Sequence, residues 1–128
     1  MARELISSGT VWEKKYGYSR AVKVGNLVFV SGTTAVDESG EVVGPDDLYT
    51  QASFIWQKIE RALHKAGATM QNVVRIRTFI TDMSRYPDVL KAQGEVFENI
   101  RPAATLVEVT ALIDARLLVE IEADAVIE

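Results

Sequence analysis

The sequence predicts an α+β fold, a single mixed β-sheet of five to six strands with two helices on one face. Apolar residues recur at three- and four-residue steps over 48–66 and again over 86–98, which is typical of helices that bury one stripe. Short alternating or apolar runs around these segments predict strands. Two helices cannot cover both faces of such a sheet, so we expect them to share one. A length of 128 residues with 48% hydrophobic content fits one domain over 1–128.

The first half of the chain predicts a hairpin followed by a helix. Residues 21–32, AVKVGNLVFVSG, form the expected β-hairpin, because Gly25 and Asn26 tolerate the positive φ of a tight turn. A further short strand is expected over 4–7. The helix after the turn-rich segment 37–45 begins at a cap provided by Asp46 or Asp47 and ends at Gly67.

The second half predicts a strand, a helix and two more strands. We expect a strand over 73–81, a helix over 86–98, and strands over 104–112 and 117–127. In the first of these strands one face is expected to hold Val74, Ile76, Thr78 and Ile80. In the helix the residues expected to be buried are Val89, Leu90, Val96 and Phe97.

The helix-free face of the sheet is expected to mix apolar and charged side chains. Its expected members are Arg75, Arg77, Phe79, Leu106, Glu108, Thr110, Leu118, Glu120, Glu122 and Asp124. Arginines facing acidic residues on a neighbouring strand favour cross-strand pairs, and the apolar members favour burial against other subunits. The alternative is an exposed face with a few stray apolar residues.

Three segments resemble the RidA/YjgF/UK114 family: LVFVSGTTAV at the end of the hairpin, RPAATLVEV over 101–109, and VEIEADAV near the end. The resemblance covers nearly the whole chain. It implies a fold like that of one type of chorismate mutase. It also implies a homotrimer whose sheets form a central barrel, with small-molecule clefts between subunits. Better-known members of the family hydrolyse reactive enamines and imines to carbonyl compounds and ammonia.

The resemblance also implies which residues form the cleft. Glu120 would be catalytic, positioning or activating the water that attacks the imine carbon. The binding residues implied or considered are Tyr18, Ser31, Gly32, Thr33, Leu90, Arg101, Ala104, Thr105, Leu106 and Arg116. An acid flanked by other acids can have a raised pKa suited to proton transfer. The alternative for Glu120 is a structural ion pair with Arg75 or Arg77.

One departure from the family bears on the substrate. The family's deaminases have an arginine after the Pro-Ala of the turn, where it binds the substrate carboxylate, and here that residue is Ala104. An arginine fork adds both affinity and orientation, which alanine cannot supply. Leu90 stands where amino-acid-type deaminases often have asparagine, which makes the pocket more apolar. Arg101 and Arg116 are candidates to replace the missing cation, although solvation at the surface is the simpler expectation for both.

Composition narrows the remaining possibilities. The chain has no cysteine and a single histidine, His64, so we expect no metal site and no cofactor. A net charge of −4 argues against nucleic acid as a partner, and the basic residues near the N-terminus, Arg20 among them, are expected to be solvated. No apolar run is long enough to span a membrane, and the expected location is the cytoplasm. The alternatives to a deaminase-type hydrolase are a non-catalytic binding or interaction trimer and, disfavoured by the charge, an endoribonuclease or translation inhibitor.

Overall fold

The computed structural model describes residues 2–128 as one six-stranded sheet with two long helices. The strands are β1 Arg3–Ile6, β2 Ala21–Val24, β3 Leu27–Thr34, β4 Val73–Ile80, β5 Ala103–Glu108 and β6 Val119–Val126. The α-helices are α1 Val11–Tyr16, α2 Leu48–Lys65 and α3 Tyr86–Phe97, and 3₁₀ turns cover Met70–Asn72 and Met83–Arg85. The predicted α+β class, with a mixed sheet, is confirmed.

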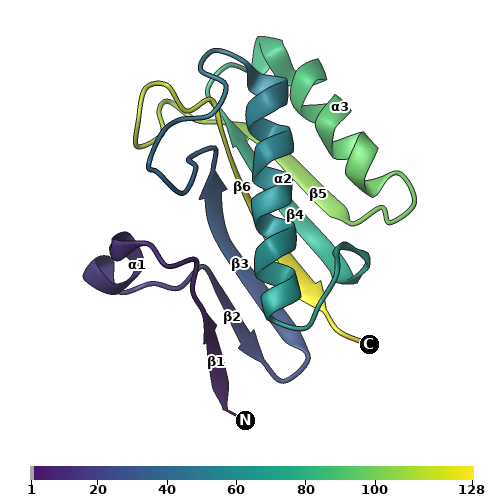
Figure 1. Cartoon of the computed structure of the whole chain (residues 1–128). Coiled ribbons are helices and arrows are strands. Elements are labelled where there is room, and N and C mark those ends of the chain that lie inside the picture. The colour runs from purple at the N-terminus through teal and green to yellow at the C-terminus, as the bar shows by residue number, and fades with distance from the viewer. Residues whose placement is uncertain (1) are drawn as a thin grey trace.

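Helices α2 and α3 lie side by side across the sheet (Figure 1). The predicted stripe on α2 is confirmed, since Leu48, Ala52, Ile55, Ile59 and Ala62 are all buried. Asp47 caps the helix by accepting a hydrogen bond from the Thr50 amide, and Gly67 follows its end with a φ of 83°. No helix within residues 2–128 combines the length and the apolar character that crossing a membrane requires.

The strand order is β1-β2-β3-β6-β4-β5, so β6 lies in the middle of the sheet although it follows every other strand in the chain. β6 is antiparallel to both neighbours, β3 and β4. β5 is parallel to β4 and forms one edge, reached through α3. The side chains of β6 alternate as predicted, with Val119, Ile121, Ala123 and Ala125 buried under the helices.

Register within β4 and β5 differs from the prediction at three points. An irregularity between Val73 and Arg75 leaves Val74 exposed and buries Val73 instead, because one extra residue reverses the alternation. Leu106 pairs with buried Thr78, so it lies on the helix side, not on the open face. Glu108 pairs with Ile80 and is likewise on the helix side. β5 ends at Glu108, short of the predicted residue 112, because its partner β4 ends at Ile80.

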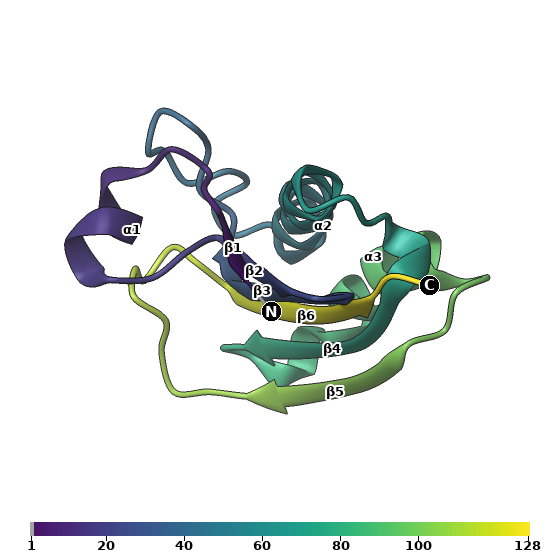
Figure 2. The same ribbon diagram turned by 90° about the horizontal axis from the view of Figure 1, so that it is seen from below.

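Two further differences concern the helices. α1 was not predicted: it has six residues, buries only Glu13, and therefore has no apolar stripe to reveal it. It lies apart from α2 and α3, beyond the β1–β3 side of the sheet (Figure 2). On α3, Val89 and Phe97 are buried as predicted, whereas Leu90 is 40% exposed. The buried face of this helix runs from Val89 to Ala92, which turns Leu90 away from the core.

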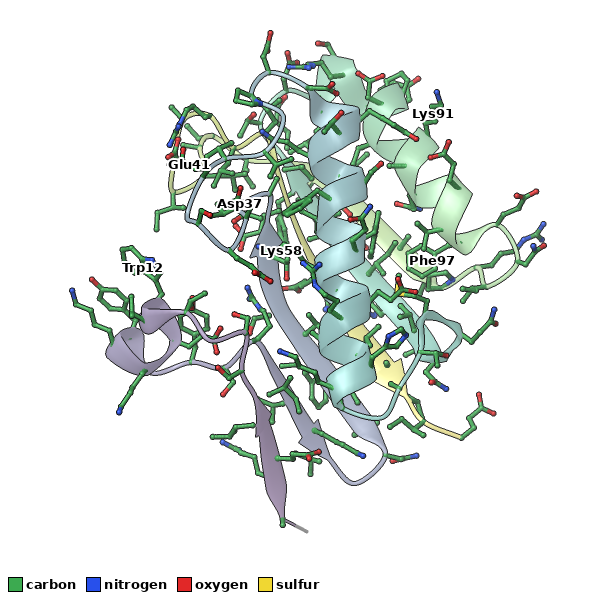
Figure 3. All side chains as sticks on the ribbon, in the orientation of Figure 1. Trp12, Asp37, Glu41, Lys58, Lys91 and Phe97 are labelled. Atoms are coloured by element: carbon green, nitrogen blue, oxygen red, sulfur yellow. The ribbon has the colours of Figure 1, made fainter. Side chains whose placement is uncertain are left out.

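The contact between α2 and α3 centres on two aromatic rings. Phe97, labelled in Figure 3, meets Trp56 edge to face, with ring centroids 4.8 Å apart. Both rings are nearly fully buried. Trp56 is therefore a packing residue of the core.

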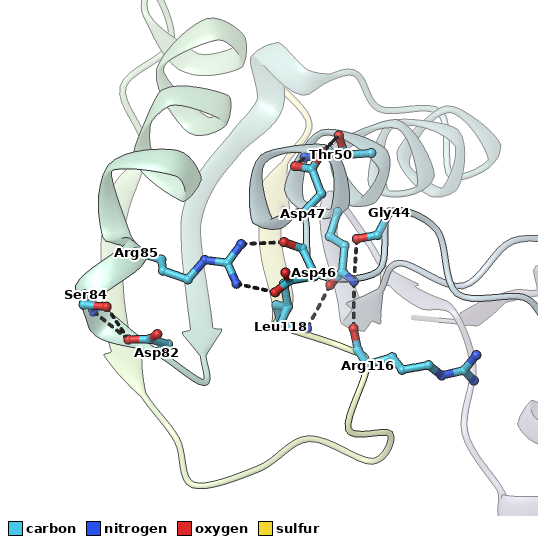
Figure 4. A network of polar contacts seen from close by, with 10 residues as sticks. Gly44, Asp46, Asp47, Thr50, Asp82, Ser84, Arg85, Arg116 and Leu118 are labelled. Carbon is cyan, nitrogen blue, oxygen red and sulfur yellow. Dashed lines mark hydrogen bonds and ion pairs between the residues drawn. The ribbon is translucent and has the colours of Figure 1, made fainter.

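Gln51 on α2 connects the helix to the start of β6. Its side-chain nitrogen donates to the carbonyls of Gly44 and Arg116, at 3.2 and 2.9 Å, and its side-chain oxygen accepts from the amide of Leu118 at 2.8 Å. The side chain is fully buried. Nearby, the Arg85 guanidinium donates to the carboxylate and to the backbone carbonyl of Asp46 (Figure 4). These bonds connect the turn after β4 to the turn before α2.

We expect Gln51→Leu to lower the free energy of unfolding by about 2–4 kcal/mol, because two carbonyls and one amide would lose their partner in a buried site. Chemical denaturation measures this change. Gln57→Leu is the matched control on the same helix, since Gln57 is exposed, and it should change stability by less than about 0.5 kcal/mol. Equal losses in both variants would contradict the role given to Gln51.

Candidate functional site

Glu120 lies on the open face of the sheet, paired with Thr34 of β3 and Phe79 of β4. Its carboxylate lies directly over Gly32, where β3 departs from regular pairing between Val30 and Thr33. A Cβ on residue 32 would come within 2.1 Å of Glu120 Oε2. Only glycine fits at this position while the carboxylate keeps its place.

The hydroxyl groups near Glu120 bond to the backbone. Ser31 Oγ donates to the carbonyl of Ser19 at 2.7 Å, and Thr33 Oγ1 donates to the carbonyl of Ser31 at 2.8 Å. Thr33 is fully buried and pairs with Ile121, which places its side chain on the helix side. Gly32 and the Ser31 backbone therefore lie beside Glu120, whereas the side chain of Thr33 faces the core.

Burial raises the pKa of the Glu120 carboxyl; the charge of Arg20 lowers it, and the charge of Glu122 raises it further. The alternative that Glu120 pairs with Arg75 or Arg77 is wrong, since neither arginine forms an ion pair with it among residues 2–128. Arg77 Nη1 instead contacts Glu122 at 3.1 Å and Asp124 at 3.3 Å. Glu120 is therefore a partly buried acid that the nearby sheet arginine leaves free.

Two cations near this site were missed by the sequence reasoning. Arg20, expected to be solvated, is mostly buried and donates from Nη2 to the carbonyl of Gly32 at 2.7 Å. Lys58 on α2 donates to the carbonyls of Thr34 and Val36, at 2.7 and 2.9 Å (Figure 3). Burial, with the charges of Arg20 and Arg61, lowers the pKa of Lys58 to about 8. The signal available in the sequence was Arg20's position, one residue before a strand that starts with buried Ala21.

Tyr18 follows α1 and is 43% exposed. Its amide donates to the carbonyl of Glu13, and its position in the chain places it next to Ser19, which accepts the Ser31 hydroxyl. We call Tyr18, Arg20, Ser31, Gly32 and Glu120 the acid cluster.

Except for Arg116, the other predicted binding residues lie at the opposite edge of the sheet. Leu90 and Arg101 line the same open depression between α3 and the start of β5, with a volume of about 570 Å³. Pro102 and Phe97 line it too. Arg101 has a φ of 57°, which non-glycine residues rarely adopt, and its Nε donates to the Glu98 carbonyl at 3.2 Å. We call this depression the α3–β5 pocket.

The three β5 candidates alternate across the strand. Ala104 and Leu106 pair with Ile76 and Thr78 on the helix side, whereas Thr105 pairs with Arg77 on the open face. Arg116 belongs to neither group: its Nη2 contacts Asp114 at 2.8 Å in the loop before β6. Its guanidinium is bound to that carboxylate.

The acid cluster and the α3–β5 pocket are far apart within one chain. Gly32 on β3 is three strand positions from β5, and three interstrand spacings of about 4.8 Å give roughly 14 Å. Glu120 lies on β6 with only β4 between it and β5, so two spacings give roughly 10 Å. One copy of the chain thus does not bring the predicted cleft residues into a single site.

The comparisons with known proteins agree with this fold. The model of the Endoribonuclease L-PSP family matches residues 12–127. Rv2704 from Mycobacterium tuberculosis, a member of the YjgF/YER057c/UK114 family, is 46% identical. The match covers 98% of this chain and 100% of that one, with a TM-score of 0.89. The chain belongs to the RidA/YjgF/UK114 family.

Other members of the family are also similar. The 3-aminoacrylate deaminase RutC of Acinetobacter baylyi is 33% identical over 104 residues, covering 81% of this chain and 82% of that protein. The RutC family protein PYRAB12510 of Pyrococcus abyssi is 33% identical over 126 residues and covers 98% of both chains.

Within residues 2–128 no three histidine or acidic side chains gather in a way that could hold a metal ion. Glu120 is half-buried and its pKa is raised, and a carboxylate in such a place can accept and return a proton.

We expect Glu120→Gln to stabilise the protein at pH 7. Because the folded-state pKa of Glu120 is raised above its ordinary value of 4.5, wild-type stability falls as pH rises through the interval between these two values. The amide cannot ionise, so the gain should shrink below about pH 4. Urea denaturation at both pH values measures it, with the exposed Glu38→Gln as a charge-matched control. A gain independent of pH would contradict the prediction.

Proposed function

We propose that this protein is a deaminase-type hydrolase that converts reactive enamines or imines to carbonyl compounds and ammonia. The observation that carries the proposal is the acid cluster, in which a partly buried carboxylate with a raised pKa lies over a glycine that leaves it room. Membership of a family that includes a 3-aminoacrylate deaminase supports the same reaction class. Here Glu120 is the catalytic residue.

An enamine first tautomerises to the imine, which reacts in its protonated form, and the iminium carbon is the electrophile. Glu120, as the carboxylate, takes a proton from water while the water oxygen bonds to that carbon and the C=N π pair moves to nitrogen, which gives a neutral carbinolamine. Glu120 then gives this proton to the nitrogen. The C–N bond breaks, ammonia leaves with the bonding pair, and the hydroxyl oxygen forms the carbonyl as its proton passes to solvent.

We propose that the cleft is completed between copies of the chain in a homotrimer. In one copy β4 lies between Glu120 on β6 and the β5 edge next to the α3–β5 pocket, and Gly32 on β3 is one strand farther away, so we infer that a ligand that touches both lies between subunits. The open face supports such an assembly, since Leu27 and Phe29 are 40% and 45% exposed on β3. Among its charges, Arg77 is paired within the chain with two acids of β6, whereas Arg75 and Glu120 form no ion pair among residues 2–128. Apolar area and a charge cluster that is paired within the chain suit burial.

The substrate we propose lacks a carboxylate held by β5. Ala104 carries no charge, and Leu90 adds an apolar wall to the pocket where it lies. Binding would then rest on Tyr18, the backbone at Ser31–Gly32 and the hydroxyl of Thr105. Arg101 in the same pocket is the remaining cation for a substrate anion, whereas Arg116 is bound to Asp114.

A non-catalytic binding trimer is the second candidate function. The observation that favours it is Ala104, because the reaction of 2-imino acids depends on orientation of the substrate as well as on the Glu120 carboxylate. It would keep the cleft and bind a small molecule without turning it over. Loss of turnover in Glu120→Gln separates the two candidates.

Purified protein should hydrolyse imines without an adjacent carboxylate faster than it hydrolyses 2-aminoacrylate, measured by competition with semicarbazide.

Ala104→Arg should raise turnover of 2-aminoacrylate on the order of a hundredfold, because a guanidinium fork restores the carboxylate anchor. Ala103→Arg is the control, with the same cation on the other side of β5. Glu120→Gln should abolish all turnover. No turnover of any imine by the wild-type protein would reject the enzyme in favour of the binder.

Sedimentation equilibrium at micromolar concentration should give a mass of three chains. Phe29→Glu should dissociate this assembly without unfolding the subunit, because it places a charge on the open face where the side chain is already exposed in one copy. Ile113→Glu, in a loop where the side chain is 90% exposed, should leave the mass unchanged. A monomeric wild-type protein would contradict the assembly.

A further inference from the structure

Arg20, a member of the acid cluster, differs in its burial from the other basic residues near the N-terminus. Lys14 and Lys15 are exposed on α1, whereas the Arg20 side chain is mostly buried. Its Nη2 donates to the Gly32 carbonyl at 2.7 Å, and its backbone carbonyl accepts from the Ser31 amide at 3.0 Å. Arg20 thus stabilises the irregular part of β3 through hydrogen bonds of both the Arg20 side chain and the Arg20 backbone.

Gly32 connects Arg20 to Glu120. The glycine's missing side chain leaves the space that the Glu120 carboxylate fills, while its carbonyl accepts the Arg20 guanidinium. The guanidinium and the carboxylate therefore contact the same residue from two sides. Arg20 Nε is buried and has no hydrogen-bond partner among the described residues. A buried cation with an unused donor is costly unless a nearby negative charge compensates it.

We propose that Arg20 is the positioning residue of Glu120, which fixes Gly32 under the carboxylate and supplies the counter-charge that keeps this carboxylate ionised as a base. This inference rests on the proposed function for its catalytic meaning, although the coupling itself needs no substrate. In hydrolysis, an ionised Glu120 can take a proton from water, whereas a protonated one cannot.

The charges around the pair support this role. Burial lowers the pKa of Arg20, while Tyr18, Glu13 and Glu120 raise it, and the group remains a cation at neutral pH. Glu122 on the same face raises the pKa of Glu120, and Glu122 is itself contacted by Arg77. Arg20 is therefore the cation that opposes the effect of burial on Glu120.

Lys58 is the second cation near this segment, and it has another role. Its ammonium bonds the carbonyls of Thr34 and Val36, two and four residues beyond Gly32, and so fixes the turn after β3. Its neighbours in charge are Arg20, Arg61 and Asp37. Lys58→Gln therefore removes a nearby positive charge without removing the contact to Gly32, which makes it a matched control.

The test is an NMR titration of the Glu120 side-chain carboxyl carbon, assigned with Glu120→Gln. In Arg20→Gln the titration midpoint should move upward, and the acidic limb of the pH–kcat profile should move with it. At neutral pH kcat should fall roughly tenfold, with a smaller change in KM, because the base is misplaced and partly protonated. Arg20→Lys should return the midpoint most of the way towards the wild-type value. Lys58→Gln should shift it less than Arg20→Gln does.

An unchanged midpoint in folded Arg20→Gln would overturn the proposal, as would an equal shift in Lys58→Gln. If Arg20→Gln does not fold, the wild-type protein provides the reciprocal measurement. The ¹⁵Nε shift of Arg20 should follow the Glu120 midpoint, and this pH dependence should vanish in Glu120→Gln. An Arg20 ¹⁵Nε chemical shift that does not change at the Glu120 midpoint would overturn the proposal. A protein that shows the coupling but hydrolyses no imine would contradict the proposed function alone.

Discussion

The pairing of β6 along both of its edges is the constraint on which this structure depends. Antiparallel ladders to β3 and β4 fix the register of β6, and with it the face on which each of its acids lies. A slip of one residue would turn Glu120 into the core and bring Ile121 to the surface. Gln51 holds the start of the strand by bonding the Leu118 amide. The position of the acid is thus set by the sheet rather than by a flexible loop.

The same register explains how one face combines apolar and charged residues. Arg77 contacts two acids two residues apart on β6, so these acids share one positive charge within the chain. Glu120, next along the same face, lies instead over Gly32 near a buried arginine. One strand therefore carries acids in two environments. Glu122 and Asp124 contact a sheet arginine, whereas Glu120 can exchange a proton.

The sequence was enough to predict the two long helices, the order of the strands along the chain and the alternation of β6, because long apolar periodicities report burial directly. It could not reveal the irregularity at Val74, since a bulge depends on the partner strand. Leu106 was placed on the wrong face for a similar reason: its side is set by pairing with Thr78. Arg20 was missed because an isolated arginine has the same appearance whether it is solvated or buried. The acid itself was found through the family resemblance, and its surroundings required the fold.

The central place of β6 has a consequence for how the protein is made. β6 follows all other strands in the chain, yet β3 and β4 meet only through it. During synthesis on the ribosome, β1–β3 and β4–β5 can form only as two partial sheets, each with an unpaired strand at its edge. Such edges are templates for wrong pairing, so the nascent chain is vulnerable until its last strand emerges.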